Sequence, residues 1–337
     1  MADFQRVGAA GRGIRRAPGR SLRGRVARSL AGINAWLRPV EGATRASVLA
    51  PAQAPDHAPT GARDHAPDRA STATPPWSIA FYYGAAEPQL PSQLLEFDLA
   101  VVEPGYGFEP STVADTRTRW LAYVSVGEVH CSRNYHADIP EHWIIGRNSA
   151  WQADIIDQGA PGWAAFFVER VIAPLWQRGY RGFFLDTLDS YLSVIDNDVL
   201  RERNRAGLVA VVRAIRERFA DAQLILNRGF ELLPAVHGEI YAIAFESLFK
   251  GWNERRREYV EVPPGDRHWL LEQAGMARAL YGLPVIAIDY CPPEDVLGAR
   301  DTVARIRSLG LVAYVGDGRL QVLNLAAARR GQERFIR

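Results

Sequence analysis

Eight short apolar segments, each ending at a polar or acidic residue, recur along the chain after residue 77. The clearest of them, residues 183–190, opens with three apolar residues and continues into Asp186 and Asp189. A run without a polar break is typical of a strand that is buried on both faces, as in parallel sheets. The carboxyl ends of parallel strands share one edge, where α/β proteins hold their ligands. The pattern therefore predicts an α/β fold with a polar site at the strand ends, although either acid taken alone could instead cap a helix.

The apolar segments alternate with helices or helix-length segments, which is the order expected of a single (β/α)8 TIM barrel. The strands are predicted at residues 78–84, 97–104, 120–128, 183–186, 223–229, 240–247, 284–290 and 311–317. The clearest helix is predicted at residues 198–219, where Leu208, Val212 and Ile215 share one face and charged residues fill the other. A doubly wound open sheet is the alternative. No glycine-rich phosphate loop follows the first strand, which disfavours a nucleotide-binding fold.

The connection between the third and fourth strands is the longest in the predicted barrel. It is expected to be a long loop that leads into a helix over residues 163–178. Pro174 is expected to kink that helix, because proline lacks the N–H that a helical hydrogen bond requires. Two further helices are predicted at residues 266–280 and 293–309, each followed by a glycine that suits a helix end.

Residues 1–75 have a different composition, rich in arginine, proline and alanine. Such a segment buries too little apolar area to offset its ordering entropy, so we expect a disordered leader before a barrel domain at residues 77–325. Residues 1–70 contain twelve arginines and five acids, about +7, whereas the whole chain carries +2, so the predicted barrel is acidic. The basic charge belongs to the leader, and no nucleic-acid partner is expected.

Membrane and export signals are weak in this sequence. The chain contains no run of 18 apolar residues, so no transmembrane segment is predicted. Arg15 and Arg16 precede a weakly apolar stretch, but that stretch is too short and interrupted for a clean signal peptide. The localisation is therefore unknown from the residues alone.

Cysteine and histidine are sparse. The two cysteines, Cys131 and Cys291, are either free or joined in one bridge. His130, Cys131 and His136 lie close together in sequence, but their spacing matches no usual zinc signature. We therefore expect neither a metal nor another cofactor.

Polar side chains at the strand ends should converge on one rim of the barrel. Those expected to bind substrate are Tyr82, Tyr83, Glu103, Glu128, Asp189, Asn227, Arg228, Trp252, Asp289 and Tyr290. The acids, together with Asp317, predict a negative potential that favours cationic sugars, unless several of them are paired or capped. Tryptophans offer faces for stacking on sugar rings, with core packing as the alternative for each. The candidates are Trp143, Trp151, Trp163, Trp252 and Trp269.

Asp186 and Glu246 are the residues expected to perform the chemistry. Asp186 ends the fourth strand beside Thr187 and Ser190, whose hydroxyls are expected to hydrogen-bond its carboxylate and keep it ionised. Glu246 lies among aromatic residues, so burial should raise its pKa, as a general acid near neutral pH requires. Two carboxylates with separated pKa values are typical of glycosidases. The ends of the fourth and sixth strands should face each other with a carboxyl separation of about 5–5.5 Å, which predicts a retaining mechanism.

Four segments carry a family resemblance: residues 184–190, 226–231, 245–248 and 283–290. Together they resemble the family 114 glycoside hydrolases, and most closely the exopolysaccharide hydrolase domains of the Pel type. The resemblance covers about residues 77–320 and implies a (β/α)8 barrel that cleaves α-1,4-linked polysaccharide rich in galactosamine or N-acetylgalactosamine. It also implies that Asp186 and Glu246 are the catalytic carboxylates, and it suggests a periplasmic or secreted protein.

Two other functions compete with this interpretation. A non-catalytic carbohydrate-binding barrel would keep the aromatic residues, but it has no need for Asp186 and Glu246 together. A metal-dependent lyase or aldolase would need a ligand set or a lysine at a strand end, and neither is found in the sequence. The predicted function is therefore an endo-acting glycoside hydrolase that works as a monomer on a polysaccharide.

Overall fold

The predicted strand segments form one eight-stranded parallel sheet in the computed structural model, which describes residues 77–113 and 117–328. The strands are β1 (Ile79–Tyr82), β2 (Leu99–Val102), β3 (Arg119–Ser125), β7 (Gly182–Asp186), β8 (Gln223–Asn227), β9 (Ala242–Glu246), β12 (Val285–Tyr290) and β13 (Val312–Gly316). They follow one another in sequence order, without the reversal of a doubly wound sheet. β13 lies against β1, and the Tyr83 N–H donates to the Leu320 carbonyl beside them. The (β/α)8 barrel is confirmed, whereas the predicted leader lies outside the described residues.

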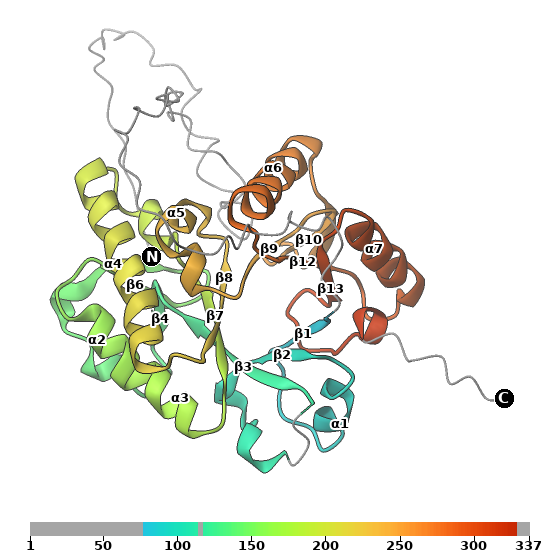
Figure 1. Cartoon of the computed structure of the whole chain (residues 1–337), viewed down its shortest axis with the longest axis horizontal. Coiled ribbons are helices and arrows are strands. Elements are labelled where there is room, and N and C mark those ends of the chain that lie inside the picture. The colour runs from blue at the N-terminus through green and yellow to red at the C-terminus, as the bar shows by residue number, and fades with distance from the viewer. Residues whose placement is uncertain (1–76, 114–116, 329–337) are drawn as a thin grey trace, which may run out of the picture. The chain divides into compact units, whose positions relative to one another are not determined.

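Helices surround this sheet (Figure 1). They are α1 (Leu90–Leu94), α2 (Trp163–Phe167), α3 (Ala173–Gln177), α4 (Asp198–Arg218), α5 (Leu233–Val236), α6 (Pro264–Tyr281) and α7 (Val296–Ser308). The Asn197 side chain caps α4 by accepting a hydrogen bond from the Leu200 N–H. α6 ends at Gly282, whose φ of 65° is a conformation that glycine adopts without steric cost. Within the two described ranges, no helix has both the length and the apolar character that a membrane crossing requires.

Short 3-10 turns fill many of the connections. They are η3 (Pro104–Tyr106), η4 (Pro110–Thr112), η5 (His136–Asp138), η6 (Glu141–Trp143), η8 (Ser190–Ser193), η9 (Phe230–Leu232), η10 (His237–Glu239) and η11 (Leu325–Ala327). Where a kink was expected near Pro174, the helix changes from α-helical to π-helical geometry. A π-helical turn, η7 (Val168–Ile172), joins α2 to α3, and Pro174 lies in the first turn of α3. Because proline cannot donate a helical hydrogen bond, the helix widens just before it.

The expectation of a long loop after the third strand is wrong. The segment instead forms a three-stranded antiparallel sheet in the order β4 (Glu128–His130), β6 (Ala153–Ile156) and β5 (Ile144–Asn148). The pairing of β5 with β6 shifts register between Ile144 and Gly146, and the side chains of β5 are not buried alternately. The regular alternation by which a strand is recognised in sequence is therefore absent.

A second antiparallel pair, which the sequence did not predict, follows β9. Its strands are β10 (Lys250–Asn253) and β11 (Glu258–Glu261). The rings of Trp252 and Tyr259 pack with centroids 4.8 Å apart. A Cβ at Gly318 would lie 2.2 Å from the Trp252 ring, so only glycine allows the loop after β13 to approach this hairpin so closely.

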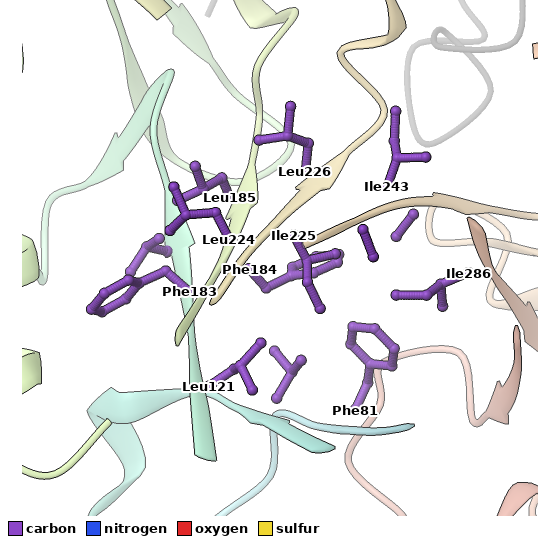
Figure 2. Close-up of a cluster of buried hydrophobic side chains, with 14 of the residues drawn as sticks. Phe81, Leu121, Phe183, Phe184, Leu185, Leu224, Ile225, Leu226, Ile243 and Ile286 are labelled. Carbon is purple, nitrogen blue, oxygen red and sulfur yellow. The ribbon is translucent and has the colours of Figure 1, made fainter. Parts of the chain in front are cut away.

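Apolar side chains fill the barrel (Figure 2). The ring of Phe81 on β1 lies 5.0 Å from Phe184 on β7 and 5.5 Å from Tyr314 on β13, measured between centroids. Successive strand residues point to opposite faces, so Phe183 points away from Phe81 (Figure 2). This packed interior leaves the strand ends as the place for a site. The cysteines do not pair: Cys131 is exposed, Cys291 is buried, and both are free.

Candidate active site

A continuous chain of hydrogen bonds runs across five neighbouring strands at the carboxyl end of the barrel. From β3, the Tyr123 hydroxyl donates to Asp186 Oδ2 on β7 at 2.8 Å. From β8, the Asn227 amide nitrogen donates to Asp186 Oδ1 at 2.8 Å and to Glu246 Oε1 on β9 at 2.9 Å. From β12, the Tyr290 hydroxyl donates to Glu246 Oε2. The two predicted catalytic carboxylates are thus brought together, and each of their four oxygens accepts a hydrogen bond.

The bridging amide of Asn227 limits how far apart the two carboxylates lie. Its nitrogen is 2.8 Å from Asp186 Oδ1 and 2.9 Å from Glu246 Oε1, so these two oxygens are at most 5.7 Å apart. The two N–H bonds of a planar amide diverge widely, which places the oxygens about 5 Å apart. Sheet order explains the arrangement, because β8 lies between β7 and β9.

These three central strands end in the same backbone conformation. The residue after each bridged side chain is left-handed without being glycine: φ is 60° at Thr187, 59° at Arg228 and 64° at Ser247. Each such residue costs about 1–2 kcal/mol, so neighbouring structure must hold it in place. The Gly127 N–H does so for Thr187 by donating to its Oγ1 at 2.9 Å. The sharp turn leaves the preceding polar side chain at the barrel mouth.

Glu246 is a carboxyl group with a raised pKa. Burial raises its pKa above the ordinary value, and the negative charge of Asp186 raises it further. Hydrogen bonds from Tyr290 and Asn227 lower the pKa, as does the charge of Arg228, but they do not offset burial. The direction predicted from the aromatic surroundings is confirmed.

Asp186 has hydrogen-bond partners different from those expected. Thr187 Oγ1 donates to the backbone carbonyl of Asp186 at 2.7 Å, and Ser190 donates to Glu128 instead. The expectation was wrong because the left-handed turn at Thr187 carries the following residues away from the strand direction. Residues of the adjacent strands, Tyr123 and Asn227, lie beside the carboxylate instead.

Tyr83 lies near the pair, and its role in substrate binding stays a prediction. Its ring packs on Tyr123 with centroids 4.8 Å apart. Burial, together with the charges of Asp186 and Glu246, raises the pKa of Tyr83 well above its ordinary value, so its hydroxyl keeps its proton. Tyr82 is directed elsewhere, because it is 5% exposed and donates to the Ala85 carbonyl at 2.8 Å.

Glu103 is paired with an arginine that the sequence analysis did not identify. Arg133 donates Nη1 and Nη2 to the two Glu103 oxygens at 2.7 and 2.8 Å. Glu103 also accepts the Gly105 N–H at 2.8 Å at the start of η3. A bidentate pair of this kind neutralises the acid and fixes the loop after β2.

Glu128 is a buried acid that accepts hydrogen bonds from the end of β5 and the start of η8. Its side chain accepts from Ser190 Oγ at 2.7 Å and from the Asn148 amide at 3.1 and 3.2 Å. Burial raises its pKa, and the nearby charge of Asp186 acts in the same direction. The residue is 5% exposed, so its position suits a support for neighbouring loops better than an open substrate contact.

Asp289 is fully buried, which contradicts the substrate contact expected of it. Its carboxylate accepts the backbone N–H groups of Leu248, Phe249 and Lys250 at 2.6 to 3.1 Å. It therefore holds the turn that follows Glu246. Burial raises the pKa of Asp289 to about 6 despite these bonds.

Arg228 lies among acids at the end of β8. Burial raises the pKa of Asp189 to about 7, and the charge of Arg228 opposes that rise. The same charge lowers the pKa of Glu246, so Arg228 acts on both acids. Asp317 accepts backbone N–H groups of Arg319 and Val322. Glu103 is thus paired and Asp289 and Asp317 are capped, which is the alternative that weakens the argument for a negative field.

The tryptophan candidates divide into three groups by exposure. Trp143 and Trp163 are buried in the core and are wrong as stacking residues. Trp252 and Trp269 are partly buried, and Trp252 donates Nε1 to Glu254 at 2.7 Å. Trp151 is exposed.

Three residues that contribute to this end of the barrel escaped the sequence analysis: Tyr123, Arg133 and Asn148. For Tyr123 a signal was present. It lies two residues before Ser125 on the predicted third strand, and residues two apart on a strand point to the same face. No comparable pattern marks the other two, which lie in the segment mistaken for a loop. In the part of the chain that the structure describes, no three His, Cys, Asp or Glu side chains gather as metal ligands would.

The chain was compared with known families and structures. A family model described as glycoside-hydrolase family GH114 matches residues 62–332. The glycoside hydrolase domain of PelA from Pseudomonas aeruginosa is 36% identical with a TM-score of 0.66, over 73% of this chain and 96% of that one. Ega3 of Aspergillus fumigatus, solved in complex with galactosamine, is 14% identical with a TM-score of 0.52, over 78% and 99% of the two chains. None of the curated proteins compared with the chain matches it.

Proposed function

This chain belongs to glycoside hydrolase family GH114 and is a glycoside hydrolase, and from that premise we propose that it cleaves α-1,4-linked galactosamine-rich polysaccharide within the polymer. The galactosamine bound to the structurally similar Ega3 supports the choice of sugar. Free and N-acetylated galactosamine units both belong to this substrate class. No cofactor enters the proposed reaction.

The observation that carries the mechanism is the shared amide of Asn227. Retaining glycosidases hold their two carboxyl groups about 5–5.5 Å apart, whereas inverting enzymes leave about 6.5–9.5 Å for a water molecule. The limit of 5.7 Å between the bridged oxygens of Asp186 and Glu246 supports retention.

In the first step of this mechanism, Asp186 attacks the anomeric carbon of the sugar. Glu246 gives its proton to the glycosidic oxygen as the bond between that oxygen and the anomeric carbon breaks. The raised pKa of Glu246 suits it to hold that proton, and Tyr123 and Asn227 hold the Asp186 side chain in position through hydrogen bonds. The product is a covalent ester between the sugar and Asp186.

In the second step, Glu246 acts as a base. It takes a proton from water while the water oxygen attacks the anomeric carbon, and the ester bond to Asp186 breaks. Two inversions at one carbon give net retention. Tyr290 and Asn227 stabilise the Glu246 carboxylate during the interval in which it is ionised.

A carbohydrate-binding barrel without catalysis is the less supported alternative. It would not need two carboxylates joined through one amide, and it does not agree with membership of a hydrolase family. Incubation of the purified protein with acetylated and de-N-acetylated galactosaminan, followed by mass analysis of the products, tests the proposal. We expect shorter oligosaccharides from at least one polymer, and intact polymer in both samples would contradict it.

A further inference from the structure

In the described residues, the exposed aromatic side chains lie in two loops at the carboxyl end of the barrel. Among residues 77–113 and 117–328, only Tyr106 and Trp151 are aromatic residues with a largely exposed side chain, at 53% and 49%. Tyr106 ends η3, directly after β2, and Trp151 lies between β5 and β6 in the segment after β3. β2 and β3 are neighbours, so both loops start from the same side of the barrel mouth.

The loop of Tyr106 is tied to the segment that carries Trp151. Glu103 caps η3 by accepting the Gly105 N–H, and its two oxygens bind both terminal nitrogens of Arg133. Arg133 belongs to the connection between β4 and β5. One bidentate ion pair therefore joins the loop of Tyr106 to the connection that leads into β5, and Trp151 lies in the turn that follows β5.

Hydrogen bonds connect the turn of Trp151 to η8, the segment that follows β7. Asn148 accepts the Ala150 N–H at 3.1 Å and donates to Glu128, which also accepts from Ser190 in η8. η8 follows β7 and Asp186 in the chain. Gln152, next to Trp151, has the left-handed φ of 50°, so the turn has a specific backbone shape.

We propose that Tyr106 and Trp151 form a distal subsite that binds the polysaccharide beyond the sugars flanking the cleaved bond. The inference rests on the proposed function. It adds the path of the bound polymer, which would follow the side of the barrel mouth formed by the loops after β2 and β3. Each ring offers an apolar face to the C–H groups of a sugar ring, with a polar group at its edge. Because their loops are already fixed, little ordering entropy is lost on binding.

A protein-binding surface is less consistent with the same residues. Exposed aliphatic side chains such as Val199, Leu280 and Leu297 lie on α4, α6 and α7, and none of them belongs to the two loops. Tyr106 and Trp151 are single rings on separate turns rather than parts of one apolar patch. Spaced rings suit an extended polymer, whose sugar units are bound one at a time.

Binding is tested separately from turnover in the full chain carrying Glu246→Gln, which we expect not to consume the polymer. Affinity electrophoresis measures how far galactosaminan in the gel slows the migration of each protein, which reports polymer binding. We expect Trp151→Ala and Tyr106→Ala each to weaken polymer binding about 3- to 10-fold, as loss of one stacking contact implies. Trp151→Phe should keep most of the binding, and Leu280→Ala is the matched control for loss of an exposed apolar side chain. Thermal unfolding of all four variants should match the parent.

The second test measures kcat and KM for the same substitutions in the chain that keeps Glu246. We expect Trp151→Ala to raise KM for long galactosaminan and to leave kcat and KM for the shortest cleaved oligosaccharide unchanged. Polymer binding equal to that of the parent, or an equal loss on the shortest substrate, would overturn the subsite while leaving the hydrolase assignment intact. A parent chain that neither binds nor cleaves galactosaminan would instead overturn the proposed substrate and the subsite together.

Discussion

The side chain of Asn227 gives the site its geometry. An amide is neutral and carries two N–H donors on one nitrogen, so it can hold two carboxylates without adding charge. An aspartate at this position would add a third negative charge, and an alanine would leave the two acids to repel each other. The predicted barrel placed the strand of Asn227 between those of the two acids, but the hydrogen bonds of its amide to both carboxylates were not predicted.

Removal of either of the two proposed catalytic acids gives the first prediction. Asp186→Asn and Glu246→Gln should each reduce turnover of galactosaminan by at least ~100-fold, the usual scale for losing an acid–base group. Both variants should unfold at temperatures close to that of the parent, because the amides fit the same space. Glu231→Gln is the matched control, since Glu231 is another glutamate with a raised pKa and lies in η9, just after β8. Full activity of Glu246→Gln together with an inactive Glu231→Gln would show that the acid is misassigned.

The hydroxyl of Tyr290 gives a prediction about pH. Its hydrogen bond lowers the pKa of Glu246, so Tyr290→Phe should raise that pKa further. Glu246 must be protonated to act as the acid, and its pKa therefore sets the alkaline limb of kcat/KM against pH. We expect this limb to move to higher pH in Tyr290→Phe. If the limb stays in place or moves to lower pH, the Tyr290 hydroxyl does not lower the pKa of Glu246.

At the scale of elements, the sequence identified the barrel strands and main helices, because fully apolar runs and amphipathic periodicity are strong signals. It missed β4, β5 and β6, where β5 pairs with β6 through a register shift and burial along β5 does not alternate. It also misjudged Asp289, since an acid that accepts buried backbone N–H groups looks in sequence like an acid that binds a ligand. Only the path of the chain after β9 distinguishes these roles.

The connection after β7 gives a prediction about stability. Asp189 holds its proton more tightly in the folded protein, with a pKa of about 7, than in an unfolded chain near 3.8. Folding stability from this group is thus highest below pH 4 and is lost as pH rises to about 7, at about 1.4 kcal/mol for each unit of pKa difference. Asp189→Asn removes the titration. Its melting temperature relative to the parent should rise between pH 4 and pH 7, and a constant difference across that range would contradict the burial of this acid.

At the scale of the whole molecule, the charge is segregated along the sequence. Residues 1–70 carry about +7 within a total of +2, and every residue of the hydrogen-bonded site lies between residues 83 and 290. We therefore predict that a chain lacking residues 1–70 turns over soluble oligosaccharides within about twofold of the full chain, because the leader's charge acts through space rather than in the site. Steady-state kinetics of both chains at matched ionic strength is the measurement. A large loss in a truncated chain that still melts cooperatively would assign the leader a part in catalysis.

The central claim is that two carboxylates bridged by Asn227 cleave the polymer with retention, and the configuration of the first product tests it most directly. Proton NMR, recorded during the first minutes of galactosaminan hydrolysis, distinguishes the two anomers of the new reducing end before they equilibrate. A bridge of at most 5.7 Å predicts the α anomer first, followed by slow appearance of the β anomer. Initial formation of the β anomer would show inversion, and it would contradict the assignment of Asp186 as the nucleophile.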